Sequence, residues 1–164
     1  MDLYIVRHAW AFDRDDSRWP DDDLRPLTEE GKERFAKMAK TLAGRGLAPQ
    51  LIATSPLVRC QQTAELLAAG VKGKPKIVRL DELRPGGDLP SLVRWTATQA
   101  AEHERIAWVG HSPDVDRICA AMIGGPDALV RFSKGAVAAI EFDRPPALGA
   151  GELRWLVTAK VLGC

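Results

Sequence analysis

Four basic side chains of this sequence stand at or just beyond the ends of short apolar runs. Arg7 and His8 follow LYIV, Arg59 lies shortly after LIAT, and His111 follows AWVG. Arginine offers planar, permanently charged donors that match the oxygens of a phosphate group. A neutral histidine can attack phosphorus, and a second, protonated one can donate to an oxygen in the transition state. If the fold brings the four together, they form an oxyanion site.

Two segments of the chain share a pattern that could bring these residues to one place. In LIATSPLVR and WVGHSPDV, a short apolar strand leads into Ser-Pro and then into a helical pattern. We expect Ser55 and Ser112 to cap these helices, with a contact from the Ser112 backbone to substrate as a secondary possibility. The carboxyl ends of parallel strands and the N-termini of the following helices meet along one edge of a sheet, where anions bind. Arg59, in the first helical turn, should reach back to that edge.

The order of the remaining elements predicts the fold class. Four strand–helix units followed by two strands favour a three-layer α/β/α sandwich around a mostly parallel six-stranded sheet, built as a single domain over residues 1–164. Phe35, Met38, Ala39 and Leu42 form one buried stripe of the first helix. The expected strands are 3–7, 50–54, 76–80, 105–110, 135–142 and 152–159, and the expected helices begin at Thr28 and cover 55–69, 89–103 and 111–124.

Composition and charge narrow the classes of protein. The chain has 164 residues, with 23 basic and 22 acidic side chains and a formal net charge of +1. This balance predicts no general attraction to nucleic acid or to a membrane surface. The first strand begins at Asp2, which leaves no room for a signal peptide, and the three cysteines form no disulfide or zinc pattern. We therefore expect a cytoplasmic protein.

The Asp-rich segment 10–26 is the least regular part of the sequence. Its carboxylates lack the spacing of a metal site, and it is interpreted as a flexible, solvated loop beside the site. Trp10 and Trp19 could instead form an apolar rim for a docking protein. The remaining histidine, His103, is expected on the surface of its helix, so the sequence predicts no metal cluster.

Four motifs resemble the histidine phosphatase superfamily, whose fold is shared with cofactor-dependent phosphoglycerate mutases. The resemblance implies that His8 is the phosphorylated nucleophile and that Arg7 and Arg59 bind the phosphoryl oxygens. It also implies that His111 completes the pocket. No metal or cofactor is expected, because the cationic side chains perform the neutralisation that a metal performs elsewhere. The motifs are RHA at 7–9, where the family signature is RHG, PLTEEGKERF at 26–35, SPLVRCQQTA at 55–64 and VGHSPDV at 109–115.

Within the superfamily the chain is similar to the small SixA group, phosphohistidine phosphatases of bacterial signalling. Its short length, the RHA motif and ELRPGGD at 82–88 carry this similarity. Larger members have a cap insertion and a glutamate general acid, whose position falls at Pro85 here. Glu82 and Asp88 lie near enough to substitute for it, and Glu82 is taken as the candidate acid. An imidazole leaving group, with a reference pKa of about 6.5, depends less on such an acid than an alkoxide does.

These observations favour a metal-independent phosphatase that acts on a phosphohistidine of a signalling or phosphotransfer protein. A phosphatase of small phosphomonoesters is the nearest alternative, and an open site makes a mutase less favoured. A non-catalytic phosphoprotein-binding module is a third hypothesis. The presence of His8 argues against that module, because binding alone needs arginines but no nucleophile.

Overall fold

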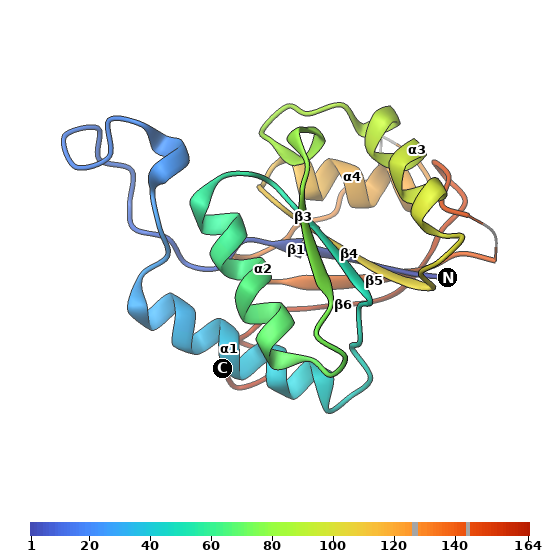
Figure 1. Ribbon diagram of the computed structural model, residues 1–164, viewed down its shortest axis with the longest axis horizontal. Coiled ribbons are helices and arrows are strands. Elements are labelled where there is room, and N and C mark those ends of the chain that lie inside the picture. The colour runs from blue at the N-terminus through green and yellow to red at the C-terminus, as the bar shows by residue number, and fades with distance from the viewer. Residues whose placement is uncertain (126–127, 144) are drawn as a thin grey trace.

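The computed structural model describes residues 1–125, 128–143 and 145–164, and a six-stranded sheet forms the centre of this part of the chain (Figure 1). The strands lie in the order β3-β2-β4-β1-β5-β6. β1 to β4 pair in parallel, whereas β5 is antiparallel to β1 and β6 is antiparallel to β5. The prediction of a mostly parallel sheet is confirmed. The bounds are β1 Asp2–Arg7, β2 Leu51–Thr54, β3 Lys76–Arg79, β4 Arg105–Gly110, β5 Val137–Glu141 and β6 Glu152–Val157.

Helices cover both faces of the sheet, so the predicted three-layer architecture is also confirmed. α1 (Glu29–Ala43) and α2 (Val58–Gly70) pack on one face, and α3 (Leu89–Gln99) and α4 (Asp114–Ile123) pack on the other (Figure 1). Thr28 caps α1 through its side chain, which accepts from the Gly31 amide. The predicted apolar stripe of α1 is buried against the first face. Within the described residues, no helix is long and apolar enough to cross a membrane.

The register between β1 and β4 places the candidate residues side by side. Arg7 lies opposite Gly110, so His8 and His111 each follow by one residue at the same edge of the sheet. The His8 amide donates to the Gly110 carbonyl at 2.9 Å, which continues the pairing beyond the strands. Two residues separated by more than a hundred positions are therefore neighbours because their strands are neighbours.

The expected serine caps are wrong. α2 begins at Val58 with Leu57 at its N-cap, and α4 begins at Asp114 with Pro113 at its N-cap, in both cases without a side-chain cap. The Ser55 hydroxyl instead contacts an imidazole and accepts from the amide of Leu57, which precedes the helix, and the Ser112 hydroxyl donates to a carboxylate. The third helix also ends earlier than expected, at Gln99, so His103 lies beyond the helix and is half-buried.

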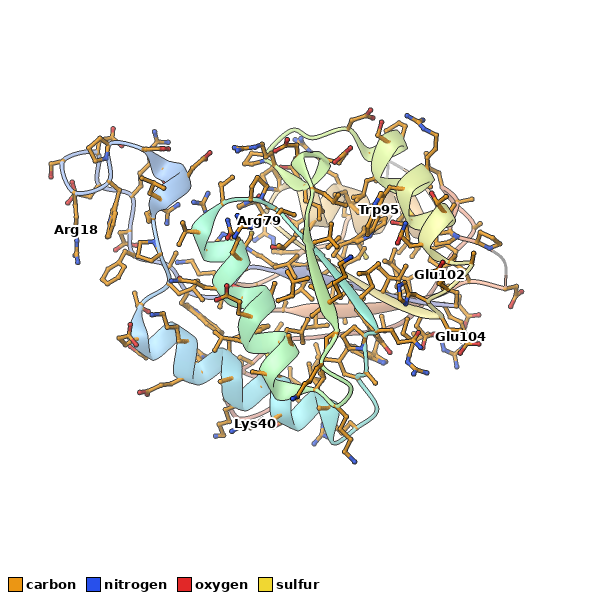
Figure 2. All side chains as sticks on the ribbon, viewed as in Figure 1. Arg18, Lys40, Arg79, Trp95, Glu102 and Glu104 are labelled. Atoms are coloured by element: carbon orange, nitrogen blue, oxygen red, sulfur yellow. The ribbon has the colours of Figure 1, made fainter. Side chains whose placement is uncertain are left out.

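The segment 10–26 is more structured than a flexible loop. Its outer part extends away from the body of the molecule, where Arg18 covers the rings of Phe12 and Trp19 (Figures 1 and 2). It then returns through the short 3-10 helix η1, Asp22–Leu24, whose first residue contacts α2. Trp10 packs beneath the Arg34 guanidinium, 4.2 Å from the ring centroid. Docking on the tryptophans stays a prediction.

Candidate active site

His8 is held in an orientation that leaves one ring nitrogen free. The side chain is only 8% exposed, and its Nδ1 lies 2.7 Å from the Ala9 carbonyl oxygen. A carbonyl can only accept, so Nδ1 carries the proton and donates it, and Nε2 keeps its lone pair. The Ala9 amide donates in turn to Thr63 Oγ1 at 3.0 Å, which ties this turn to α2. His8 therefore presents Nε2 as a nucleophile.

His111 lies across from His8 and is equally buried. The two ring centroids are 5.3 Å apart, with the planes tilted by 59°. Burial lowers the pKa of His8 to about 3, and the positive charge of Arg59 adds to this effect. Burial and Arg59 likewise lower the pKa of His111 to about 3. Both imidazoles are therefore neutral near pH 7, which differs from the expectation of a protonated second histidine: any donation by His111 comes from a neutral ring.

Arg59 is 4% exposed and is held by η1. Its Nη1 donates to the Asp22 carbonyl at 2.7 Å, and its Nη2 pairs with Asp22 Oδ2 at 3.0 Å. Its Nε is buried without a partner among the described residues. Burial lowers the pKa of Arg59, and Asp22 opposes that shift. Each terminal nitrogen thus uses one of its two N–H groups, and the buried Nε–H has no partner among the described residues.

Arg7 repeats this arrangement with a different support. Its Nη1 donates to the Phe132 carbonyl at 2.7 Å, and its Nε too is buried without a partner in the described part of the chain. Asp116 fixes the supporting segment, because its Oδ1 accepts from the Phe132 amide at 2.8 Å. Its Oδ2 accepts from the Ser112 hydroxyl at 2.6 Å. Asp116 thus positions Arg7 through a backbone segment rather than by direct contact.

The two unused Nε–H groups have a chemical consequence. Buried donors are almost always paired, and leaving one unpaired costs on the order of 1–3 kcal/mol. An oxyanion beside His8 can satisfy both guanidinium groups at once. Arg7, His8, Arg59 and His111, predicted together from the sequence, are thus assembled around a place suited to a phosphoryl group.

The candidate acids are placed differently from one another. Asp88 caps α3, where its Oδ1 accepts from the Ser91 amide at 3.3 Å, so it serves the helix. Glu82 lies in the 3-10 helix η2 (Asp81–Leu83), and no hydrogen bond or ion pair of its carboxylate is found among the described residues. It lines a cavity of about 260 Å³ that Gly110 also borders. Its role as a proton donor stays a prediction, as does substrate contact by the Ser112 backbone.

Several supporting residues were missed by the sequence reasoning. Asp22 was assigned to a solvated run, although it pairs with Arg59 across 37 positions. Cys60 was assigned to the core, and it is buried there, but its Sγ also lies 3.4 Å from His111 Nε2. The motif around Arg59 contained Ser55, but helix-capping rules gave it a different role. Within the described residues, no group of three or more His, Cys, Asp or Glu side chains is placed to hold a metal ion.

The chain is similar to several known proteins. The model of the histidine phosphatase superfamily (branch 1) matches residues 3–131. An uncharacterised protein of Picosynechococcus sp. is 40% identical over 116 residues, which cover 70% of this chain and 68% of that protein. The phosphohistidine phosphatase SixA of Escherichia coli strain K12 is 28% identical over 159 residues, or 94% and 92% of the two chains.

A solved structure extends the similarity to the whole fold. The protein histidine phosphatase SixA in complex with tungstate superposes with a TM-score of 0.86 at 25% identity, covering 99% of each chain. The family model spans the four site residues and most of the sheet. The chain therefore belongs to the histidine phosphatase superfamily, with its SixA-type fold, and is a phosphatase.

Proposed function

We propose that the protein hydrolyses phosphohistidine on a partner protein through a covalent intermediate on His8. The observation that carries this proposal is the state of the His8 ring. Its Nδ1 is committed to the Ala9 carbonyl at 2.7 Å, and its lowered pKa keeps Nε2 unprotonated near pH 7. A buried histidine with a free Nε2 between two arginines is suited to attack on phosphorus.

The reaction has two steps. In the first, His8 Nε2 forms a bond to phosphorus as the bond between phosphorus and the substrate imidazole breaks. That imidazole leaves with its electron pair on the released nitrogen and is neutral if its other nitrogen already carries a proton. In the second, water attacks phosphorus, the bond to His8 breaks, and inorganic phosphate leaves with the proton balance restored by solvent.

Each remaining group has a role in this scheme. Arg7 and Arg59 hold the phosphoryl oxygens through their unused Nε–H groups, and the N–H of neutral His111 donates to a third position as charge develops. Their donors are preorganised, because Phe132 and Asp22 hold the guanidinium groups before substrate arrives. Little rearrangement is then needed at the moment of transfer.

Two observations support the substrate class: the names of similar proteins and the short connection between β3 and β4. One relative is named a phosphohistidine phosphatase, and the solved SixA structure binds tungstate, an oxyanion. The connection from β3 to β4 holds only η2 and α3, so this connection carries no extra helices to cover the site. Without such helices, a phosphohistidine that stands on a protein surface can approach this edge of the sheet. We infer a signalling or phosphotransfer protein as the partner.

A second candidate function is hydrolysis of small phosphomonoesters. The observation that favours it is that Glu82 lines the cavity that Gly110, one residue before His111, also borders. An alkoxide leaving group requires a proton, and a carboxylic acid at this edge of the site can supply it.

Labelling with radioactive phosphate tests the intermediate. Wild-type protein mixed with a labelled phosphohistidine protein should carry an acid-labile label, and His8→Ala should carry none. His103→Ala is the matched control, because His103 lies outside the site and should leave labelling unchanged. Wild-type protein that turns over substrate without any label contradicts the covalent mechanism.

The same protein distinguishes the two substrate classes. We expect kcat/KM on a phosphohistidine protein to exceed that on a panel of small phosphomonoesters by at least about tenfold, because the imidazole leaves without a dedicated acid. A clear preference for phosphomonoesters, abolished in Glu82→Gln, contradicts the proposed substrate and supports the second candidate.

A further inference from the structure

Ser55 is completely buried beside His111. The side chain is 0% exposed, and its Oγ lies 2.9 Å from His111 Nε2. This contact joins the end of β2 to the end of β4, which are neighbouring strands. It replaces the helix cap that the Ser-Pro pattern predicts. A buried hydroxyl aimed at a catalytic imidazole has consequences for the proton of that ring.

The surroundings of the hydroxyl determine which atom donates. The Leu57 amide donates to Ser55 Oγ at 3.4 Å and uses one of its lone pairs. The serine proton must still find an acceptor, because buried hydroxyl groups are almost always hydrogen-bonded. His111 Nε2 is the strong acceptor within reach, whereas the sulfur of Cys60 accepts only weakly. The Ser55 O–H therefore donates to Nε2.

The proton of neutral His111 must then lie on the other nitrogen. Burial raises the pKa of the Cys60 thiol, so no thiolate competes for a proton beside Nε2. The partner found for Nδ1 in the described part of the chain is the same sulfur, at the long distance of 3.9 Å, and sulfur accepts only weakly. Nδ1–H is therefore the ring donor that remains free for a ligand. In the opposite tautomer a lone pair at Nδ1 would repel a phosphoryl oxygen.

We propose that Ser55 is a positioning residue that fixes His111 in the Nδ1–H tautomer, so that the neutral ring donates to the phosphoryl group during transfer. This inference rests on the proposed function for its catalytic consequence, whereas the tautomer itself belongs to the free protein. Ser55 acts through His111 and does not touch the substrate. Its loss should lower kcat more than it changes KM, because the donated hydrogen bond strengthens as charge develops.

Nitrogen NMR of histidine side chains tests the tautomer directly. At neutral pH the wild-type His111 signals, assigned by their loss in His111→Asn, should show a protonated Nδ1 and an unprotonated Nε2. In Ser55→Ala the preference should shift toward Nε2–H, and kcat should fall about 10–100-fold, below the range for deleting a full oxyanion donor. A protonated Nε2 in wild-type protein overturns the proposal.

Two further variants separate positioning from packing. Ser55→Thr keeps the hydroxyl and should restore both the Nδ1–H signal and most of kcat. Thr54→Val removes a neighbouring, equally buried hydroxyl that donates to the Ser55 carbonyl at 3.1 Å, and it should change neither. An unchanged tautomer in Ser55→Ala overturns the inference, even if kcat falls. If the tautomer shifts as expected but His8 never becomes labelled, the proposed function fails and the assignment of Ser55 stands.

Discussion

The two Ser-Pro segments of this protein have similar local sequences, but one supports His111 and the other supports Arg7. Ser55 is fully buried and contacts the imidazole of His111 on a neighbouring strand end. Ser112 is half-buried and donates to Asp116 of its own helix, and its peptide bond to Pro113 is cis. Neither serine caps its helix. The same local pattern therefore carries two unrelated contacts.

The difference follows from which strands lie beside each segment. β2 lies between β3 and β4, with Thr54 paired to Val109, so the residue after β2 faces the end of β4 and its histidine. β4 lies between β2 and β1, and Ser112, two residues beyond it, contacts Asp116 in α4, which fixes the backbone that holds Arg7. One half contains Ser55, Arg59 and His111 with Asp22 as its support. The other contains Arg7 and His8 with Asp116.

Removal of an arginine from either half should have the largest effect. We expect Arg59→Ala and Arg7→Ala each to lower kcat/KM about 10²–10³-fold, because each deletes donors to the transferring phosphoryl group. Arg59→Lys should recover little, since an ammonium group cannot replace a planar guanidinium held by Asp22. Steady-state kinetics measure both. If one arginine is dispensable while the other is essential, the two halves are not equivalent in binding phosphate.

The supporting carboxylates should have smaller and unequal effects. Asp22 contacts Arg59 directly, so Asp22→Asn should raise KM about tenfold, in line with the loss of one charged hydrogen bond. Asp116 acts through the Phe132 backbone, so Asp116→Asn should have a weaker effect on the same constant. Inhibition by inorganic phosphate measures both variants without turnover. Tighter phosphate binding in Asp22→Asn would instead mean that Asp22 competes with substrate for Arg59.

The loss of folding stability at acid pH should be the smallest effect. Each half of the site should contribute to it through its own histidine. The pKa of His8 and of His111 is about 3 in the folded protein, against about 6.5 in an unfolded chain. Between these values the unfolded chain binds more protons, so stability is full above about pH 6.5 and falls as the pH drops toward 3. We expect His111→Asn and His8→Asn each to reduce the loss of Tm between pH 7 and pH 5 by a few degrees. Thermal unfolding at the two pH values checks this, and an unchanged loss in both variants contradicts it.

Much of the fold and of the site could be predicted because the signals are local. The strand–helix alternation predicted the order of the layers, and the ends of parallel strands predicted that Arg7, His8 and His111 meet at one edge. Arg59 was placed correctly because its helix begins at that same edge, although the helix starts three residues later than expected. These inferences need only the geometry of strands and helices, which short patterns reveal.

The supports could not be predicted, because they depend on contacts between distant segments. Asp22 stands among other aspartates in 10–26, and nothing in their spacing distinguishes the one that pairs with Arg59. Phe132 supports Arg7 through its carbonyl oxygen, a group that every residue carries and that no side-chain pattern marks. The hydroxyl of Ser55 satisfied a capping rule in the sequence but has a stronger use in the structure.

The sequence by itself determined which groups meet: two imidazoles and two guanidinium groups at the edge of a parallel sheet. Only the tertiary structure decided the protonation states and hydrogen-bond partners of those groups. Burial keeps both rings neutral. Asp22 holds both terminal nitrogens of Arg59 and Phe132 holds Nη1 of Arg7, while the two buried Nε–H groups have no partner among the described residues. The reason is physical: residue type sets which bonds a side chain can make, whereas burial and neighbouring strands set which of them it does make.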